Sequence, residues 1–152
     1  IGELPIGVPQ NLVPFITQTD IGKRAKITVF GDDYNTKDGS CVRDYIHVVD
    51  LAKAHVAALR LMEKAEFKGY DVFNIGTGNG NTVLEIIKAF ERVTGEKLNY
   101  TIGPRRAGDV EKVWGNVSKS EQKLHWKAEL GIDAMMSSAW AWEKYISQNP
   151  IQ

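Results

Sequence analysis

The 152-residue chain has little of what several classes of protein require. Its single cysteine, Cys41, excludes an internal disulfide framework and a cysteine-rich zinc module. Its 19 basic and 19 acidic residues cancel, which removes the broad electrostatic case for binding nucleic acid or an anionic membrane. Charged residues such as Asp50 and Arg60 interrupt the most apolar stretch before it reaches the length of a membrane span. We expect a protein of the reducing cytoplasm with no nucleic-acid partner and no membrane partner.

Familiar catalytic and metal-binding signatures are also missing. The three histidines lack the spacing of metal ligands, and His47 is interpreted as a buried histidine with satisfied hydrogen bonds. No Gly-rich loop is followed by Gly-Lys-Ser/Thr, and neither a Gly-x-Ser-x-Gly elbow nor a Tyr-x-x-x-Lys pair occurs. We therefore expect no catalytic residue and no metal site within this sequence.

Strand-like and helix-like patterns alternate along the chain, which predicts an α/β or α+β fold with short strands. Short runs of β-branched and aromatic residues predict strands at 26–30, 45–49, 70–75, 97–101 and 111–115. Helical recurrence of apolar residues predicts helices at 11–22, 50–62, 82–94 and 118–124, and a last helix from Asp133 to the stop at Asn149-Pro150. The polar segment 31–42 is long enough to be a functional loop.

Side-chain signals mark three of the expected helix starts. Thr82 with Glu85, and Ser118 with Glu121, have the spacing of a capping box, in which each side chain binds the other residue's backbone amide. Asp50 is the expected N-cap of its own helix. These three signals predict the residues at which the helices begin.

The glycine-rich segment Gly76-Thr-Gly-Asn-Gly80 follows an expected strand and precedes an expected helix. A dinucleotide fingerprint needs glycines at the spacing G-x-G-x-x-G, but Asn81 occupies the third position. We interpret the segment as a tight turn that leads into a capped helix, and assign no cofactor-binding residue to this chain.

Two groups of charged residues are candidates for binding an anion. Arg105-Arg106 lie in a Gly-bounded loop, where two guanidiniums suit a diphosphate, and Asp109 in the same loop suits a ribose diol. Arg43 precedes the expected strand that contains Tyr45. Spacing alone leaves the alternatives open, namely a solvated surface pair for the first group and a structural ion pair for the second.

Several segments taken together resemble the carboxyl-terminal half of the UDP-glucose 4-epimerase (UDP-galactose 4-epimerase) family, within the extended short-chain dehydrogenase/reductase superfamily. The segments are Ile1-Gly-Glu3, Gly7-Val-Pro-Gln-Asn-Leu12, Val29-Phe-Gly-Asp-Asp-Tyr34, Val42-Arg-Asp-Tyr-Ile-His-Val48, Phe73-Asn-Ile-Gly-Thr-Gly78 and Arg105-Arg-Ala-Gly-Asp109. They follow one another in the family's order, and the resemblance covers essentially the whole chain.

The resemblance implies that residues 1–152 are the UDP-hexose-binding carboxyl-terminal portion of an extended short-chain dehydrogenase/reductase, a small mixed sheet with helices. The Rossmann half, with its NAD loop and catalytic Tyr and Lys, would be absent. The family interconverts UDP-galactose and UDP-glucose through a 4-keto intermediate made with bound NAD. We therefore expect NAD in the full-length enzyme, none on this chain, and no activity from this chain alone.

The resemblance also implies roles for individual residues. Arg43 and Arg106 would hold the diphosphate. The other expected substrate-binding residues are Asn11 and Leu12 at the diphosphate, Thr28 and Phe30 at the uracil, Tyr45 and Val83 on the pocket wall, Asp109 at the ribose and Val113 at the hexose. Val113 stands where many members carry Tyr, so UDP-N-acetylhexosamines are expected as possible substrates beside UDP-glucose and UDP-galactose.

The resemblance also has consequences for assembly. In the family, the strand that matches 70–75 joins the sheet of the other half, and the helix from Asp50 packs nearby. We expect this chain alone to form a homo-oligomer or a swapped assembly, and the parent to be a dimer. Two alternatives stay open: another nucleotide-sugar epimerase or dehydratase of the superfamily, and a non-catalytic nucleotide-binding module.

Overall fold

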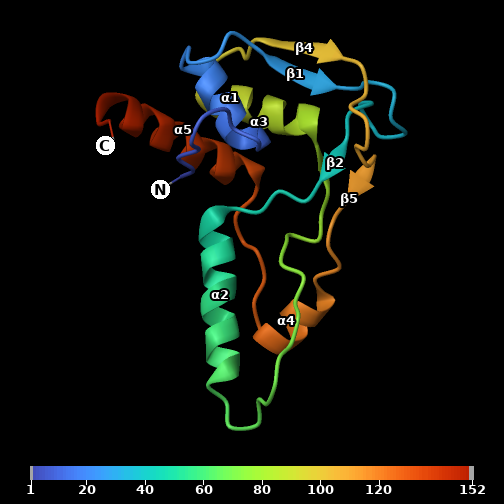
Figure 1. Ribbon diagram of the computed structural model, residues 1–152, viewed down its shortest axis with the longest axis vertical. Helices are drawn as coiled ribbons and strands as arrows, with labels where there is room; N and C mark the ends of the chain where they lie inside the picture. Colours follow the sequence, from blue (N-terminus) through green and yellow to red (C-terminus); the bar gives the residue numbers. More distant parts are fainter. Residues whose placement is uncertain (1, 151–152) are drawn as a thin grey trace.

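The computed structural model describes residues 2–150, so Ile1 of the opening segment and residues 151–152 lie outside the described residues. Within residues 2–150 the elements follow in this order: α1 Leu12–Asp20, β1 Ile27–Phe30, β2 Val42–Arg43, α2 Val48–Met62, β3 Asn81–Thr82, α3 Val83–Thr94, β4 Tyr100–Gly103, β5 Lys112–Val113, α4 Ser118–Leu124 and α5 Ile132–Gln148. Figure 1 shows how they are arranged in space.

The strands of the described residues form two small sheets. In the first, β1 and β4 run parallel, in a register that pairs Ile27 with Tyr100 and Phe30 with Gly103. In the second, β2 lies between β3 and β5, antiparallel to β3 and parallel to β5. The α/β class with a small mixed sheet, predicted from the sequence, is confirmed.

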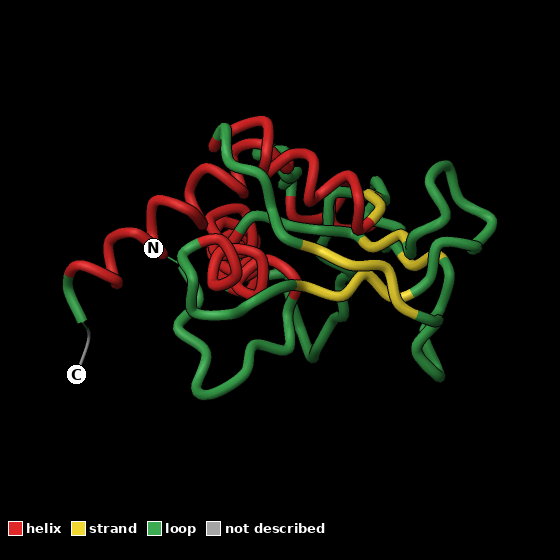
Figure 2. Tube along the Cα trace, turned by 90° about the horizontal axis from the view of Figure 1, so that it is seen from above, coloured by secondary structure: helices red, strands yellow, loops and turns green. Residues whose placement is uncertain are grey.

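The main core lies between the β1–β4 pair and helices α1, α3 and α5, which gather beneath that pair in Figure 1. Phe90, Ile16, Ile86 and Met136 are fully buried there, and the Trp140 ring meets Phe90 edge to face with centroids 5.6 Å apart. Seen from above in Figure 2, the strands run alongside the helices, and loops project beyond them. This core holds the start of α1, β1 and the start of α3 in fixed relative positions.

Helix α3 begins and ends where the sequence predicts. Thr82 Oγ1 accepts from the Glu85 amide, and Glu85 Oε2 accepts from the Thr82 amide, so the capping box is confirmed. Gly95 follows Thr94 in the left-handed conformation with φ of 78°, which a glycine adopts without steric cost. These caps fix the loop that precedes α3.

The predicted strand at 45–49 is wrong, because α2 begins at Val48 and Asp50 is not its N-cap. His47 caps the helix instead: its Nδ1 accepts from the Val49 amide at 3.0 Å. The other ring nitrogen, Nε2, lies 2.9 Å from Ser138 Oγ, so this buried histidine has partners on both sides, as predicted. The contacts that His47 makes in the fold therefore outweigh the preference of its β-branched neighbours for strand structure.

The predicted strand at 70–75 is also wrong. It has no strand partner among residues 2–150, and Tyr70 and Val72 are 90% and 68% exposed. A strand is held by hydrogen bonds to a neighbour, so without one this segment is an extended loop. The strands expected at 97–101 and 111–115 exist but are displaced or shortened, to Tyr100–Gly103 and Lys112–Val113.

The second expected capping box, at Ser118 and Glu121, is wrong although the helix itself is present. Ser118 is already the first helical residue, and Val117 is the residue before it. The Ser118 amide donates instead to Asn116 Oδ1 at 3.0 Å, so an asparagine side chain orders this start. Similarly, α5 begins at Ile132, one residue before the predicted Asp133.

Helices α2 and α4 form a second, smaller core that extends below the main one in Figure 1. Ala54, Leu124 and Trp126 are buried in it. The face of α2 that lies away from this core exposes apolar side chains, namely Val48, Val49, Leu51, Val56, Leu59 and Met62. No helix within residues 2–150 is long and apolar enough to cross a membrane.

A buried carboxylate connects the two cores. Asp50, in the first turn of α2, has no exposed surface, and its Oδ2 accepts from the backbone amides of Glu129 at 2.9 Å and Leu130 at 2.8 Å. These two residues lie just before α5. Asp50 therefore ties α2 to the segment that leads into the main core.

We predict that Asp50→Ala lowers the free energy of unfolding by about 2–4 kcal/mol, because it leaves the two backbone amides that donate to this buried carboxylate without their acceptor. Asp133→Ala is the matched control, since it removes an exposed carboxylate paired with Arg92 and should cost less than about 1 kcal/mol. Urea unfolding of both variants measures the difference. Equal losses would contradict the assigned role of Asp50.

Candidate functional site

A cavity of about 460 Å³ opens between the start of α1, strand β1, the start of α3 and the loop after β4. Nine of the ten residues that the sequence predicts for substrate binding line it: Asn11, Leu12, Thr28, Phe30, Arg43, Tyr45, Val83, Arg106 and Asp109. They come from five separate segments, so the fold brings together what the sequence keeps apart.

Strand β1 separates the core from the cavity by its alternation. Ile27 and Val29 are 4% and 1% exposed in the core, while Thr28 and Phe30 are more open. Lys26, two residues before Thr28, also lines the cavity and adds a third cation that the sequence analysis missed. The period-two pattern of the strand was the signal that could have found it.

Two arginines share one carboxylate oxygen in this cavity. Arg43 Nη2 donates to Asp109 Oδ1 at 2.9 Å, and Arg106 Nη2 donates to the same oxygen at 3.1 Å. The Asp109 side chain is 13% exposed, whereas Arg43 and Arg106 are 29% and 63% exposed. The guanidiniums therefore meet at a half-buried carboxylate and keep donors open toward the cavity.

The start of α1 also contributes to the cavity. Asn11 is the N-cap residue, and its side chain donates to Glu3 Oε1 at 2.7 Å rather than capping the helix. The amides of Leu12 and Val13 are in the first turn, where a helix supplies no acceptor, and no acidic side chain lies in that turn. Backbone amides and the helix dipole thus favour an anion at this edge.

Two aromatic side chains, Phe30 and Tyr45, line the cavity. Phe30, 42% exposed at the end of β1, has the Arg106 guanidinium 5.7 Å from its ring centroid. Tyr45 packs against the main core near Val83. Burial raises the pKa of Tyr45 to about 12, although the positive charge of Arg43 acts in the opposite direction. Its phenol is therefore neutral throughout the physiological range.

Arg105, the neighbour of Arg106, turns away from the cavity. Its guanidinium donates to the side chain and the carbonyl of Asp33, both at 2.7 Å, and lies 4.1 Å from the centroid of the Tyr34 ring. It thereby connects the loop after β4 to the loop after β1. Of the predicted arginine pair, Arg106 is in the cavity and Arg105 positions its loop.

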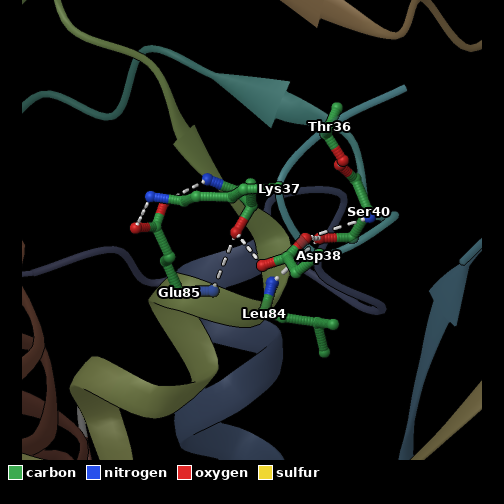
Figure 3. Close-up of polar contacts among 7 residues, drawn as sticks. Thr36, Lys37, Asp38, Ser40, Leu84 and Glu85 are labelled. Carbon is green, nitrogen blue, oxygen red and sulfur yellow. Dashed lines mark hydrogen bonds and ion pairs between the residues drawn. The ribbon is translucent and has the colours of Figure 1, made fainter. Parts of the chain in front are cut away.

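Asp38 attaches the loop between β1 and β2 to the start of α3 (Figure 3). Its Oδ1 accepts from the amide and the hydroxyl of Ser40 at 3.0 and 2.8 Å, and its Oδ2 accepts from Thr82 Oγ1. Ser40 Oγ in turn accepts from the Leu84 amide. Lys37 forms an ion pair with Glu85 beside them, so this loop is held at the helix start.

Asp44 organises the glycine-rich turn. Its carboxylate accepts from the Thr77 amide at 2.8 Å, from the Thr77 hydroxyl at 2.6 Å and from the Gly78 amide at 3.2 Å. The Gly115 amide also donates to it, at 3.4 Å. The segment bends at Gly76 and Gly78 and leads through β3 into the capped helix α3, and the Asp44 carboxylate takes the amides of Thr77 and Gly78.

Val113 is the one predicted site residue that does not line the cavity. It lies on β5, paired in register with Arg43 of β2, and its side chain is 48% exposed. It is therefore next to a cavity residue but is not part of the cavity lining. No cluster of residues that could hold a metal ion occurs within residues 2–150.

Comparison with known proteins identifies the family. The family model described as GDP-mannose 4,6 dehydratase matches residues 4–139. The chain belongs to this family. It is 49% identical over 150 residues to UDP-glucose 4-epimerase 4 of Oryza sativa subsp. japonica, an alignment that covers 99% of this chain and 40% of the relative. The chain thus spans well under half the length of the curated relatives that it matches.

Solved epimerase structures have the same fold over this region. The UDP-glucose-4-epimerase of Stenotrophomonas maltophila, with bound NAD and formylated UDP-arabinopyranose, is 44% identical with a TM-score of 0.93 and covers 98% of this chain and 44% of its own. The enzyme from Bifidobacterium longum, in complex with NAD+ and UDP, is 47% identical with a TM-score of 0.88 and covers 99% and 43%. The resemblance to UDP-glucose 4-epimerases, stated from sequence segments, is confirmed.

The hydrogen bonds of Asp38 give this member of the family a testable acid sensitivity. Partial burial would raise the pKa of Asp38, but the donors of Thr82 and Ser40 outweigh it and hold the pKa below its usual value. A lowered folded-state pKa stabilises the fold at pH values above the ordinary aspartate pKa of about 3.9, and this contribution disappears as the pH falls through the folded-state value.

We predict that Asp38→Asn makes the free energy of unfolding less dependent on pH below about pH 4.5, because the titrating group with a lowered pKa is gone. Chemical unfolding at a series of pH values from about 6 to 2.5 measures the slope in both proteins. Asp32→Asn, at an exposed aspartate in the same loop, is the control. Identical slopes for wild type and Asp38→Asn would exclude the lowered pKa.

Proposed function

We propose that this chain is the UDP-hexose-binding part of a UDP-glucose 4-epimerase. The observation that carries the proposal is the cavity, which combines two converging arginines, a helix start and an exposed aromatic ring on a strand end. These are the groups that a diphosphate and a stacked base require. The identity of 44–49% to UDP-glucose 4-epimerases supports that enzyme over other members of the family.

The arrangement of the cavity suggests how the nucleotide lies in it. The diphosphate would accept hydrogen bonds from Arg43, Arg106 and the first amides of α1. The uracil would lie against the Phe30 ring and beside the β1 backbone around Thr28. Asp109 would accept from the ribose hydroxyls, since an ionised carboxylate is purely an acceptor.

The hexose would extend past Tyr45 and Val83, two residues that line the cavity. The choice between plain hexoses and UDP-N-acetylhexosamines stays a prediction based on Val113, which is in register with Arg43 on β5 but is not part of the cavity lining. The cytoplasm likewise stays the predicted compartment.

The complete epimerase reaction would need groups outside these 152 residues. We propose that NAD, the cofactor of the full-length enzyme, binds elsewhere, because Asp44 already occupies the amides of the one glycine-rich turn that resembles a dinucleotide site. The sequence contains no Tyr-x-x-x-Lys pair to remove a proton from the sugar. The role of this chain is therefore to bind and orient the nucleotide sugar.

Two alternatives from the sequence remain as competing hypotheses. Another nucleotide-sugar epimerase or dehydratase would use the same arginines but recognise a different base at Phe30. A non-catalytic nucleotide-binding module would bind nucleotide yet belong to no larger enzyme. The first is tested by comparing UDP with GDP, and the second by finding an adjoining segment with the missing catalytic residues.

We predict that the 152-residue chain binds UDP more tightly than GDP and does not bind NAD in calorimetric titrations. Arg106→Ala should weaken UDP binding by at least about tenfold, since a charged hydrogen bond contributes about 1.5–3 kcal/mol. Arg92→Ala removes an arginine of α3 that pairs with Asp133 and should leave binding unchanged. Equal weakening in the two variants, or no heat with UDP, would refute the proposed site.

We further propose that the exposed apolar face of α2 makes this chain self-associate, as the sequence analysis expects. Light scattering of the wild-type chain at high concentration should show species larger than a monomer. Replacing Val56 and Leu59 with Lys should restore the monomer, because both lie on that face. Ile6→Lys is the control, since Ile6 is fully exposed outside the face. A monodisperse wild-type monomer would contradict this proposal. A dimeric parent enzyme stays a prediction.

A further inference from the structure

The cavity has an unequal balance of charge. Lys26, Arg43 and Arg106 are its cations, and Asp109 is its one carboxylate among the described residues. Both arginines donate to the same oxygen, Asp109 Oδ1, at 2.9 and 3.1 Å. The ligand-free cavity therefore already contains an anion where the two guanidiniums converge.

This carboxylate has two opposite effects on a phosphate ligand. It attracts Arg43 and Arg106 to one place, although like charges repel, and so prepares a pair of donors. It also repels an incoming phosphate, because a unit negative charge then lies within a few ångströms of another. Only 13% of the Asp109 side chain is exposed, so water screens this repulsion weakly.

A nucleoside diphosphate can offset that repulsion, whereas a bare diphosphate cannot. The ribose hydroxyls can donate to Asp109, giving the carboxylate new partners while the phosphates take over the arginines. Inorganic pyrophosphate has the phosphates but no hydroxyl to donate in this way. The carboxylate would then face phosphate oxygens without a compensating donor, which is costly at a half-buried position.

We propose that Asp109 is a specificity-determining counter-ion, which holds Arg43 and Arg106 together in the empty cavity and rejects diphosphates that lack a ribose. The ribose part of this inference rests on the proposed function, whereas the rejection of bare anions rests on the contacts alone. If Asp109 were only part of a structural ion pair, the opposite result would be expected. Removing its charge would then separate the arginines and weaken the binding of every anion.

The test is calorimetric titration of the 152-residue chain with inorganic pyrophosphate and with UDP at low ionic strength. In Asp109→Asn, pyrophosphate should bind about tenfold tighter, since removal of one nearby charge at an effective dielectric constant near 20 is worth more than 1.4 kcal/mol before screening. UDP should bind more weakly than to wild type, because a ribose acceptor loses its charge. The ratio of the two dissociation constants should fall by more than tenfold.

Asp133→Asn is the matched control. It makes the same chemical change at a carboxylate that is paired with Arg92 outside the cavity. It should change the affinity for neither pyrophosphate nor UDP. Near-ultraviolet circular dichroism should show that both variants keep the wild-type fold. An equal gain in pyrophosphate affinity in the two variants would indicate a general charge effect and overturn the inference.

The inference would also be overturned if pyrophosphate bound Asp109→Asn no more tightly than wild type, or did not bind it at all. Failure of the proposed function has a different signature. If UDP binds none of the proteins while pyrophosphate still binds Asp109→Asn more tightly than wild type, the uridine assignment fails but the counter-ion role stands. The pyrophosphate titrations therefore decide the counter-ion role of Asp109, and the UDP titrations decide its role toward the ribose.

Discussion

The cavity depends on holding two positive charges side by side before any ligand arrives. Arg43 ends β2, and Arg106 lies in the loop between β4 and β5. That loop is fixed at both ends, because β4 pairs with β1 and β5 pairs with β2. Strand pairing brings the arginines within reach, and the shared oxygen of Asp109 offsets their repulsion. The small sheets matter chiefly because they determine where this loop begins and ends.

Strands of two to four residues cannot hold such a loop by ladder hydrogen bonds alone, and buried or half-buried carboxylates supply the remaining links. Asp38 joins the loop after β1 to the start of α3, and Asp44 joins β2 to the glycine-rich turn and Gly115. Asp50 joins α2 to the segment before α5. Asp44 and Asp50 accept from backbone amides far along the chain, whereas Asp38 accepts from the nearby Ser40 amide and from the Thr82 hydroxyl at the start of α3. Donors in irregular segments are thus satisfied without secondary structure.

Elements whose cause is local could be predicted from the sequence. Thr82, Glu85 and Gly95 fix α3 through contacts within a few residues, and the alternation of Ile27 to Phe30 fixes β1. Predictions failed where a distant partner decides. Segment 70–75 has strand composition but no strand beside it among the described residues, and 45–49 gives way to a helix that His47 caps. A pattern reports what a segment can form, whereas the partner determines what it does form.

The candidate site divides in the same way. The positions of nine site residues could be inferred from the family resemblance, because shared motifs imply a shared arrangement of segments. Their pairings could not, since spacing offered Arg105 and Arg106 as equal members of a pair. In the structure Asp33 and Tyr34 take one guanidinium, and Asp109 takes the other. The carboxylate that each guanidinium reaches in the fold therefore explains why Arg106, which the resemblance already assigns to the diphosphate, lines the cavity while Arg105 does not.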